Sequence, residues 1–284
     1  MTAARLSLPA EDATSPAVAV SAAPRRRPLR AWLRIASIGA WTGAAYLTLL
    51  GGQAITAGSG RNRLRWRHWL VRHWSRGVAR LLGMKVRVTG APPRPPFFLV
   101  SNHLSYVDII LLYTCLDCVF IAKHEMRRWP GLGLLAHAAG TIWVNRESPR
   151  DAVRVLSEID AAMARGDGVV LFPEGTTSPG SGLLPMRPAL FDWAARRQHP
   201  VHCTAIGYRS VPGDEPAHLS ICWWGDMEFA PHLLDLCRLR GFEADVRFAP
   251  APVTAPDRGS LALRARDEIL RHFEPVVTPE RLTS

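Results

Sequence analysis

The chain has 284 residues, of which 48% are hydrophobic and 21% are charged, with a formal net charge of +11. This composition excludes a largely disordered chain and leaves room for one large domain with a membrane element. The positive charge is concentrated at the N-terminus, because residues 1–90 contain 15 of the 35 basic residues but only two of the 24 acidic ones. A basic surface of this kind suits anionic lipid head groups or nucleic acid.

The cysteines are five in number and include one Cys-x-x-Cys pair, Cys115 and Cys118. In a chain of this length, an odd count argues against a disulfide framework and favours a reducing compartment. Since no second pair of ligands follows Cys115 and Cys118, we expect buried thiols there and no metal site.

The N-terminal third predicts a tail and a membrane-associated helical element. Residues 1–30 are rich in Ala, Ser and Pro and contain a run of arginines, which predicts a disordered basic tail. Within residues 31–83, the segment 35–57 is uncharged and long enough to cross a bilayer core of ~30 Å at ~1.5 Å per residue. We expect a spanning or re-entrant membrane helix, with a buried core helix as the alternative. Arginines on both sides leave its orientation open.

Residues 61–82 carry three tryptophans and other apolar residues at helical spacing, interleaved with arginines. This pattern is typical of an amphipathic helix at a membrane interface, with indoles at head-group depth and guanidinium groups on phosphates. A solvated helix packed on the domain is the alternative. No recognised nucleic-acid-binding motif accompanies the basic stretch, so we expect no nucleic acid partner.

Residues 84–284 alternate between strand and helix patterns. The predicted strands lie at 85–89, 97–100, 119–122, 141–144, 168–172 and 201–208. The predicted helices lie at 107–116, 149–165 and 190–197. This alternation predicts an α/β domain, a mixed sheet flanked by helices, with the site at the strand ends. Asp226 and Glu228 are expected on a C-terminal strand and not in catalysis.

His103 directly follows a predicted buried strand, and Asp108 comes five residues later. On one continuous helix, five residues turn by ~500° and would separate the two side chains. With His103 in the turn before the helix and Asp108 in its first turns, the carboxylate can reach back to the imidazole. It would then fix the tautomer and leave the other nitrogen free as a general base. We expect Ser105 and Tyr106 to pack or to cap the helix.

A second polar segment, Phe172–Ser178, follows the predicted strand 168–172. Gly175 allows a positive φ or a close backbone approach. We interpret this turn as the part that positions the acceptor through Glu174, Gly175 and Thr176. Its backbone N–H groups would stabilise the oxyanion that forms when a hydroxyl attacks a thioester.

These segments resemble the glycerolipid acyltransferase family, which includes the 1-acylglycerol-3-phosphate acyltransferases. The NH-x4-D and FPEGT motifs of that family match at 102–108 and 172–176, and two further blocks are similar to 122–146 and to 200–201. The resemblance covers roughly residues 82–208. It implies a lysophospholipid acceptor, acyl-CoA or acyl carrier protein as donor, no cofactor and a helical membrane element.

Two cations are further candidates within the resemblance. Arg146 is the candidate for an acceptor phosphate or carboxylate, because a guanidinium binds such groups bidentately. Lys123 is the candidate for a contact to the donor or to a phosphate. Many family members have an arginine where this chain has Thr177, and Arg187 matches the next expected basic residue only loosely.

The acceptor expected from the resemblance is 1-acylglycerol-3-phosphate. The lyso-ornithine lipid acyltransferases of the same family are the alternative, because they are also similar at FPEGTTS and at residues 224–228. A non-catalytic, membrane-anchored lipid-binding protein is the rival from another class, and the presence of both His103 and Asp108 argues against it. The chain has no GxSxG motif, which disfavours a lipase or esterase. Cytosolic donors and reduced cysteines favour a bacterial inner membrane, with the catalytic domain facing the cytoplasm and contacting anionic lipids.

Overall fold

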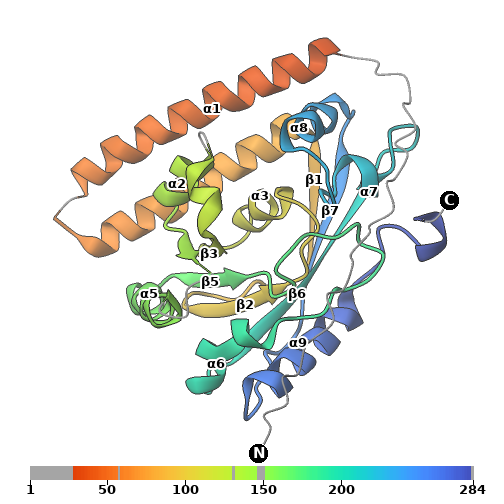
Figure 1. Cartoon of the computed structure of the whole chain (residues 1–284). Helices are drawn as coiled ribbons and strands as arrows, with labels where there is room; N and C mark the ends of the chain where they lie inside the picture. The colour runs from red at the N-terminus through yellow and green to blue at the C-terminus, as the bar shows by residue number, and fades with distance from the viewer. Residues whose placement is uncertain (1–27, 57, 130–131, 146–150, 283–284) are drawn as a thin grey trace, which may run out of the picture.

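A seven-stranded mixed sheet forms the centre of the computed structural model, which describes residues 28–56, 58–129, 132–145 and 151–282 (Figure 1). The strand order is β1-β7-β6-β2-β5-β3-β4, and all neighbours are parallel except β6 and β7. The strands are β1 (Met84–Thr89), β2 (Phe97–Ser101), β3 (Cys118–Lys123), β4 (Ile142–Val144), β5 (Gly168–Leu171), β6 (Val201–Ser210) and β7 (Phe242–Phe248). The predicted fold class is therefore confirmed.

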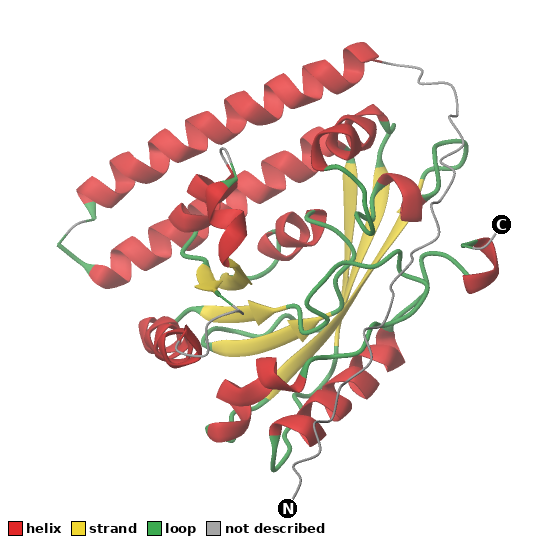
Figure 2. Cartoon of the chain, viewed as in Figure 1, coloured by secondary structure: helices red, strands yellow, loops and turns green. Residues whose placement is uncertain are grey.

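Helices cover both faces of this sheet (Figure 2). They are α1 (Pro28–Ile55), α2 (Gly60–Leu82), α3 (Val107–Tyr113), α4 (Leu132–Ala138), α5 (Asp151–Arg165), α6 (Asp192–Arg196), α7 (Ala217–Ser220), α8 (Phe229–Arg238) and α9 (Arg258–His272). Short 3-10 turns lie at His124–Arg128, Pro188–Phe191 and Pro279–Arg281. One apolar cluster joins α2, α3 and α8 to the sheet, and a second joins α5, α6 and α9 to its other face.

Strand β2 is the central strand that delivers His103. It lies between β5 and β6, and all five of its residues are buried. Phe97 and Leu99 face the α3 side, while Phe98 and Val100 face the α9 side. A continuous apolar run is what a parallel strand covered on both faces requires.

Helix α1 lies along α2 and α8 with little of its surface covered. The Trp41 indole donates to the carbonyl of Trp74, the Trp74 indole donates to Thr42, and the Arg34 guanidinium donates to the carbonyl of Leu239 at 2.6 Å. Its apolar 18-residue window is long enough to cross a membrane by length and composition, and only 6% of that window is buried. The alternative of a buried core helix is therefore wrong. The predicted tail up to residue 27 lies outside the described residues.

Part of the basic face of α2 contacts the domain and forms ion pairs with it. It begins at the Ser59 cap and ends at Gly83 in the left-handed conformation. Arg67 pairs with the buried Asp167, and Arg72 pairs with Asp117 at 2.7 Å. The prediction that the guanidinium groups of this helix face lipid phosphates is wrong for these arginines, because domain carboxylates lie within reach.

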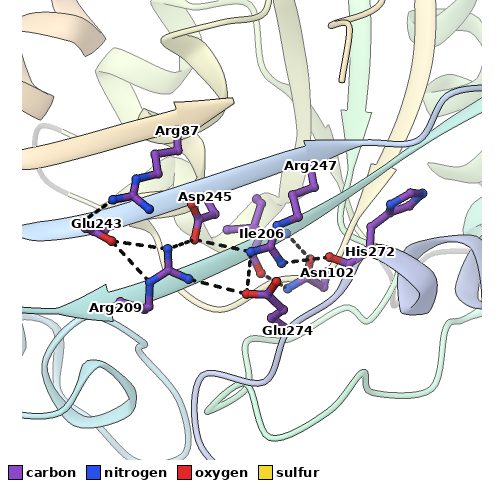
Figure 3. Close-up of polar contacts among 9 residues, drawn as sticks. All are labelled: Arg87, Asn102, Ile206, Arg209, Glu243, Asp245, Arg247, His272 and Glu274. Carbon is purple, nitrogen blue, oxygen red and sulfur yellow. Dashed lines mark hydrogen bonds and ion pairs between the residues drawn. The ribbon is translucent and has the colours of Figure 1, made fainter. Parts of the chain in front are cut away.

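A network of ion pairs crosses the outer face of β7 and β6 (Figure 3). Arg209 pairs with Asp245 at 2.8 Å and with Glu243 at 3.3 Å, and Arg247 pairs with Glu274 at 2.6 Å. Because Glu274 follows α9, the network ties the C-terminal segment to the sheet.

The same C-terminal segment reaches the turn after β5. The Val276 N–H donates to the carbonyl of Gly180 at 2.8 Å. Gly180 has a φ of +80°, and a Cβ there would lie 2.9 Å from the Val276 side chain. A side chain at Gly180 would therefore require the segment to move.

The predicted elements between β1 and β6 agree with the structure to within a few residues, whereas α7, α8, β7 and α9 have no counterpart among the predicted elements. Asp226 and Glu228 lie in the turn and loop before α8, so their assignment to a strand is wrong. Cys118 is buried as expected, and Cys115 is half-buried.

Candidate functional site

Three of the predicted site residues lie at one edge of the sheet. His103 follows β2, Glu174 follows β5, and Lys123 ends β3. These strands are neighbours and run parallel, so their carboxyl ends meet at the same edge. The Lys123 side chain is exposed. Arg146 lies outside the described residues.

His103 and Asp108 are in direct contact. The Nδ1 of His103 lies 2.7 Å from Oδ2 of Asp108, which stands in the first turn of α3. The Asp108 side chain is fully buried, whereas 19% of the His103 side chain is exposed. Among the described residues, nothing is hydrogen-bonded to Nε2 of His103. The predicted reach of the carboxylate back to the imidazole is confirmed.

Four of the residues that the structure describes form hydrogen bonds to the buried carboxylate of Asp108. Besides His103, Oδ2 accepts from the N–H groups of Leu104 at 2.7 Å and Ser105 at 3.1 Å. Oδ1 accepts from the hydroxyl of Tyr208 at 2.6 Å. These donors offset the desolvation of a buried negative charge and hold the carboxylate in one orientation. The motif predicted Asp108, but nothing in the sequence indicated Tyr208.

The plane of the His103 ring is set by aromatic stacking. Its centroid lies 3.9 Å from that of Phe172, with 10° between the planes. Phe172 stacks in turn on Phe120 at 5.8 Å. The phenylalanine that opens the FPEGT motif is therefore part of the support of His103, a role that sequence reasoning missed.

The turn after β5 is bonded to the loop that carries His103. Gly175 has a φ of +76°, as predicted, and its N–H donates to the carbonyl of Phe172 at 3.1 Å. The Ser178 N–H donates to the carbonyl of His103 at 3.0 Å. These two N–H groups are therefore engaged and do not serve an oxyanion. Within the described part of the chain, the N–H groups of Thr176 and Thr177 have no hydrogen-bond partner.

Glu174 lies inside this turn and does not face solvent. The residue is 3% exposed, and neither carboxyl oxygen has a partner in hydrogen-bonding geometry among the described residues. Burial raises the pKa of this carboxyl to about 8, and the nearby charge of Asp108 adds to the shift. The N–H groups of His103 and Leu184 favour the charged form without reaching good hydrogen-bond geometry, so burial dominates. Thr176, by contrast, is exposed.

An apolar cavity of ≈ 270 Å³ lies between the N-terminal helices and the sheet. It is lined by side chains of α1, α2, α3, α4, α8 and β3, and Tyr106 and Phe120 are among them. Phe120 stacks on Phe172, and Phe172 stacks on His103. Two stacked rings, those of Phe120 and Phe172, therefore lie between the cavity and the imidazole.

Known proteins are similar to this chain over both the site and the fold. A family model described as Acyltransferase matches residues 85–207. The lyso-ornithine lipid O-acyltransferase of Rhizobium meliloti is 41% identical over 65% of this chain and 67% of its own length. The enzyme of that name from Brucella abortus is 39% identical over 69% of this chain and 79% of its own length. The 1-acyl-sn-glycerol-3-phosphate acyltransferase of Neisseria meningitidis is 34% identical over 52% of this chain and 62% of its own length. The crystal structure of the LPA acyltransferase PlsC from Thermotoga maritima has the same fold, with a TM-score of 0.62, 18% identity, and coverage of 90% of this chain and 98% of that one.

Proposed function

This chain belongs to the acyltransferase family, and we propose that it moves a fatty acyl group from a thioester to the hydroxyl of a lysolipid, with His103 as the general base. The observation that carries this proposal is the His103–Asp108 contact, which leaves Nε2 of His103 open at the carboxyl edge of the sheet.

The proposed reaction is a direct transfer. Nε2 of His103 takes the proton of the acceptor hydroxyl as its oxygen attacks the thioester carbonyl. The N–H groups of Thr176 and Thr177 stabilise the oxyanion. The tetrahedral intermediate then expels the thiolate, which recovers the proton from His103. Asp108 stabilises the imidazolium between these steps.

We place lyso-ornithine lipid ahead of 1-acylglycerol-3-phosphate as the acceptor. Relatives named for lyso-ornithine lipid are 32–41% identical over 60–72% of this chain, whereas relatives named for the phosphate acceptor are 34–38% identical over only 43–52% of it. Thr177 also removes one cation that a phosphate would use. The remaining candidate cations are Lys123, Arg146 and Arg187, whose N–H donates to the carbonyl of Pro173 at 2.9 Å.

We propose that the N-terminal helices hold the enzyme on the membrane and that the apolar cavity receives an acyl chain. Along α1, large apolar side chains are exposed, such as Leu29 at 71% and Leu47 at 70%. Because α1 is bound to α2 and α8 along its length, it would lie in one leaflet and not leave the domain to span the bilayer. In this proposal the tail comprises residues 1–30, the membrane element comprises residues 31–83, and the catalytic domain comprises residues 84–284. We propose that this domain faces the cytoplasm at a bacterial inner membrane, because its thioester donors are cytosolic.

The test is acyl transfer by the detergent-purified full-length protein. Lyso-ornithine lipid and 1-acylglycerol-3-phosphate are offered in parallel, each with acyl-CoA and with acyl carrier protein. His103→Ala is expected to abolish transfer, whereas His199→Ala, which removes an imidazole next to Trp193 and away from the site, keeps it. Transfer by a folded His103→Ala protein at the wild-type rate would contradict the mechanism.

A further inference from the structure

Tyr208 divides the carboxylate of Asp108 into two differently bonded oxygens. Oδ2 accepts from His103 and from two backbone N–H groups, whereas the Tyr208 hydroxyl, at 2.6 Å, is the only described group that donates to Oδ1. Tyr208 is 2% exposed, so no solvent competes for this contact. The strength of that one hydrogen bond therefore affects how much negative charge Asp108 presents to His103.

Tyr208 and His103 are held in the same frame. The regular pairing of β2 with β6 ends at Ser101 and Thr204. Beyond it, the side-chain amide of Asn102 donates to the carbonyl of Ile206 at 3.0 Å and accepts from its N–H at 2.7 Å (Figure 3). Asn102 precedes His103, and Ile206 lies two residues before Tyr208 on the same face of β6. The distance from the phenol to the carboxylate is thus set by the sheet.

We propose that Tyr208 is a positioning residue for the base: it holds Asp108 in place and sets the pH at which His103 can accept a proton. The inference rests on the proposed function of His103. A phenol that donates a hydrogen bond to a carboxylate neutralises part of the negative charge of that carboxylate. The carboxylate then binds an imidazolium less strongly than it would without the phenol. Loss of the hydroxyl would therefore stabilise the protonated form of His103 and delay its action as a base to higher pH.

Several other titratable groups lie around the contact between Asp108 and Tyr208. They are Tyr106, Glu174, Cys222 and His232, from the turns before α3 and after β5, the segment before α8, and α8 itself. Burial raises the pKa of Tyr106, Tyr208 and Cys222 well above their ordinary values and lowers that of His232, so all four stay neutral between about pH 7 and 9. Glu174, whose pKa is raised to about 8, titrates within this window.

The test is the pH profile of kcat/KM, measured in a Glu174→Gln background to remove the second titration. Tyr208→Phe is expected to move the acid limb upward by about 0.5–1 pH unit, because Asp108 transmits only part of the strength of a hydrogen bond to a charged group on to His103. Tyr113→Phe removes another buried tyrosine hydroxyl from the same apolar cluster, without a contact to Asp108. It is expected to leave the acid limb where it is, whatever it does to the rate.

A second variant covers the case in which Tyr208→Phe does not fold. Incorporation of 3-fluorotyrosine at position 208 keeps the hydroxyl and nearly the same volume, and it makes the phenol more acidic and a stronger donor. The acid limb is then expected to move downward. Opposite shifts in the two variants support the inference, and an unmoved limb in a folded fluorinated enzyme overturns it. If His103→Ala is inactive and the acid limb stays in place in both Tyr208 variants, only the proposed role of Tyr208 is refuted. An active His103→Ala enzyme removes the proposed function itself.

Discussion

Replacing Glu174 by glutamine should stabilise the folded protein at alkaline pH. The carboxyl has its pKa raised by burial from 4.5 to about 8, and neither of its oxygens has a partner in hydrogen-bonding geometry among the described residues. Between these values the folded state keeps a proton that the unfolded chain has lost, so stability falls as the pH rises from about 4.5 to 8. At 1.36 kcal/mol per pKa unit, the full penalty above pH 8 is at most about 5 kcal/mol. Glutamine keeps the shape and cannot ionise.

The assay is denaturant unfolding of the full-length protein in detergent at pH 5, 7 and 9. The difference between Glu174→Gln and wild type should be small at pH 5 and reach a few kcal/mol at pH 9. Glu125→Gln is the matched control, because it removes an exposed carboxyl from the 3-10 turn after β3. A Glu174→Gln protein whose stability runs parallel to wild type across this range would refute the argument that the buried carboxyl ionises at a cost.

Three further changes test the base, the membrane element and the cavity. Asp108→Asn should lower kcat by about two orders of magnitude or more with little effect on acceptor KM, because an amide favours the wrong tautomer of His103. The measurement is steady-state kinetics, and an unchanged kcat would contradict this role of Asp108. Leu47→Asp, on the exposed face of α1, should weaken binding to anionic vesicles in a flotation assay without loss of turnover in detergent, and equal flotation would contradict the proposed membrane face. Ala139→Phe, in the cavity lining, should shift donor preference toward shorter acyl chains in a competition assay, and an unshifted preference would place the chain elsewhere.

The features that sequence could predict are those formed by residues close together in the chain. His103 and Asp108 lie five residues apart, so a turn followed by a helix was enough to predict their contact. Tyr208 lies 100 residues from Asp108, and no local pattern marks a partner at that separation. The burial of Glu174 depends in the same way on how the turn after β5 folds against its surroundings.

Two other differences have physical causes visible in the structure. Strand β7 alternates buried apolar residues with Glu243, Asp245 and Arg247, so the strand period of two was present in the sequence. Its charges are neutralised by Arg209 of β6 and by Glu274 after α9, which a single segment does not reveal. Helix α2 has the pattern of an interfacial helix, but Arg67 and Arg72 meet carboxylates of the domain first. An amphipathic pattern indicates a charged face without identifying the partner of each charge.

The contact between Gly180 and Val276 links two distant positions in how the sequence can vary. A residue larger than glycine at 180 needs both a strained positive φ and space that the valine occupies. Among homologues that keep this arrangement, a substituent at position 180 should occur together with a smaller residue at 276 or a displaced C-terminal segment. The end of the chain therefore constrains which sequences the turn after β5 can adopt, although the two are almost 100 residues apart.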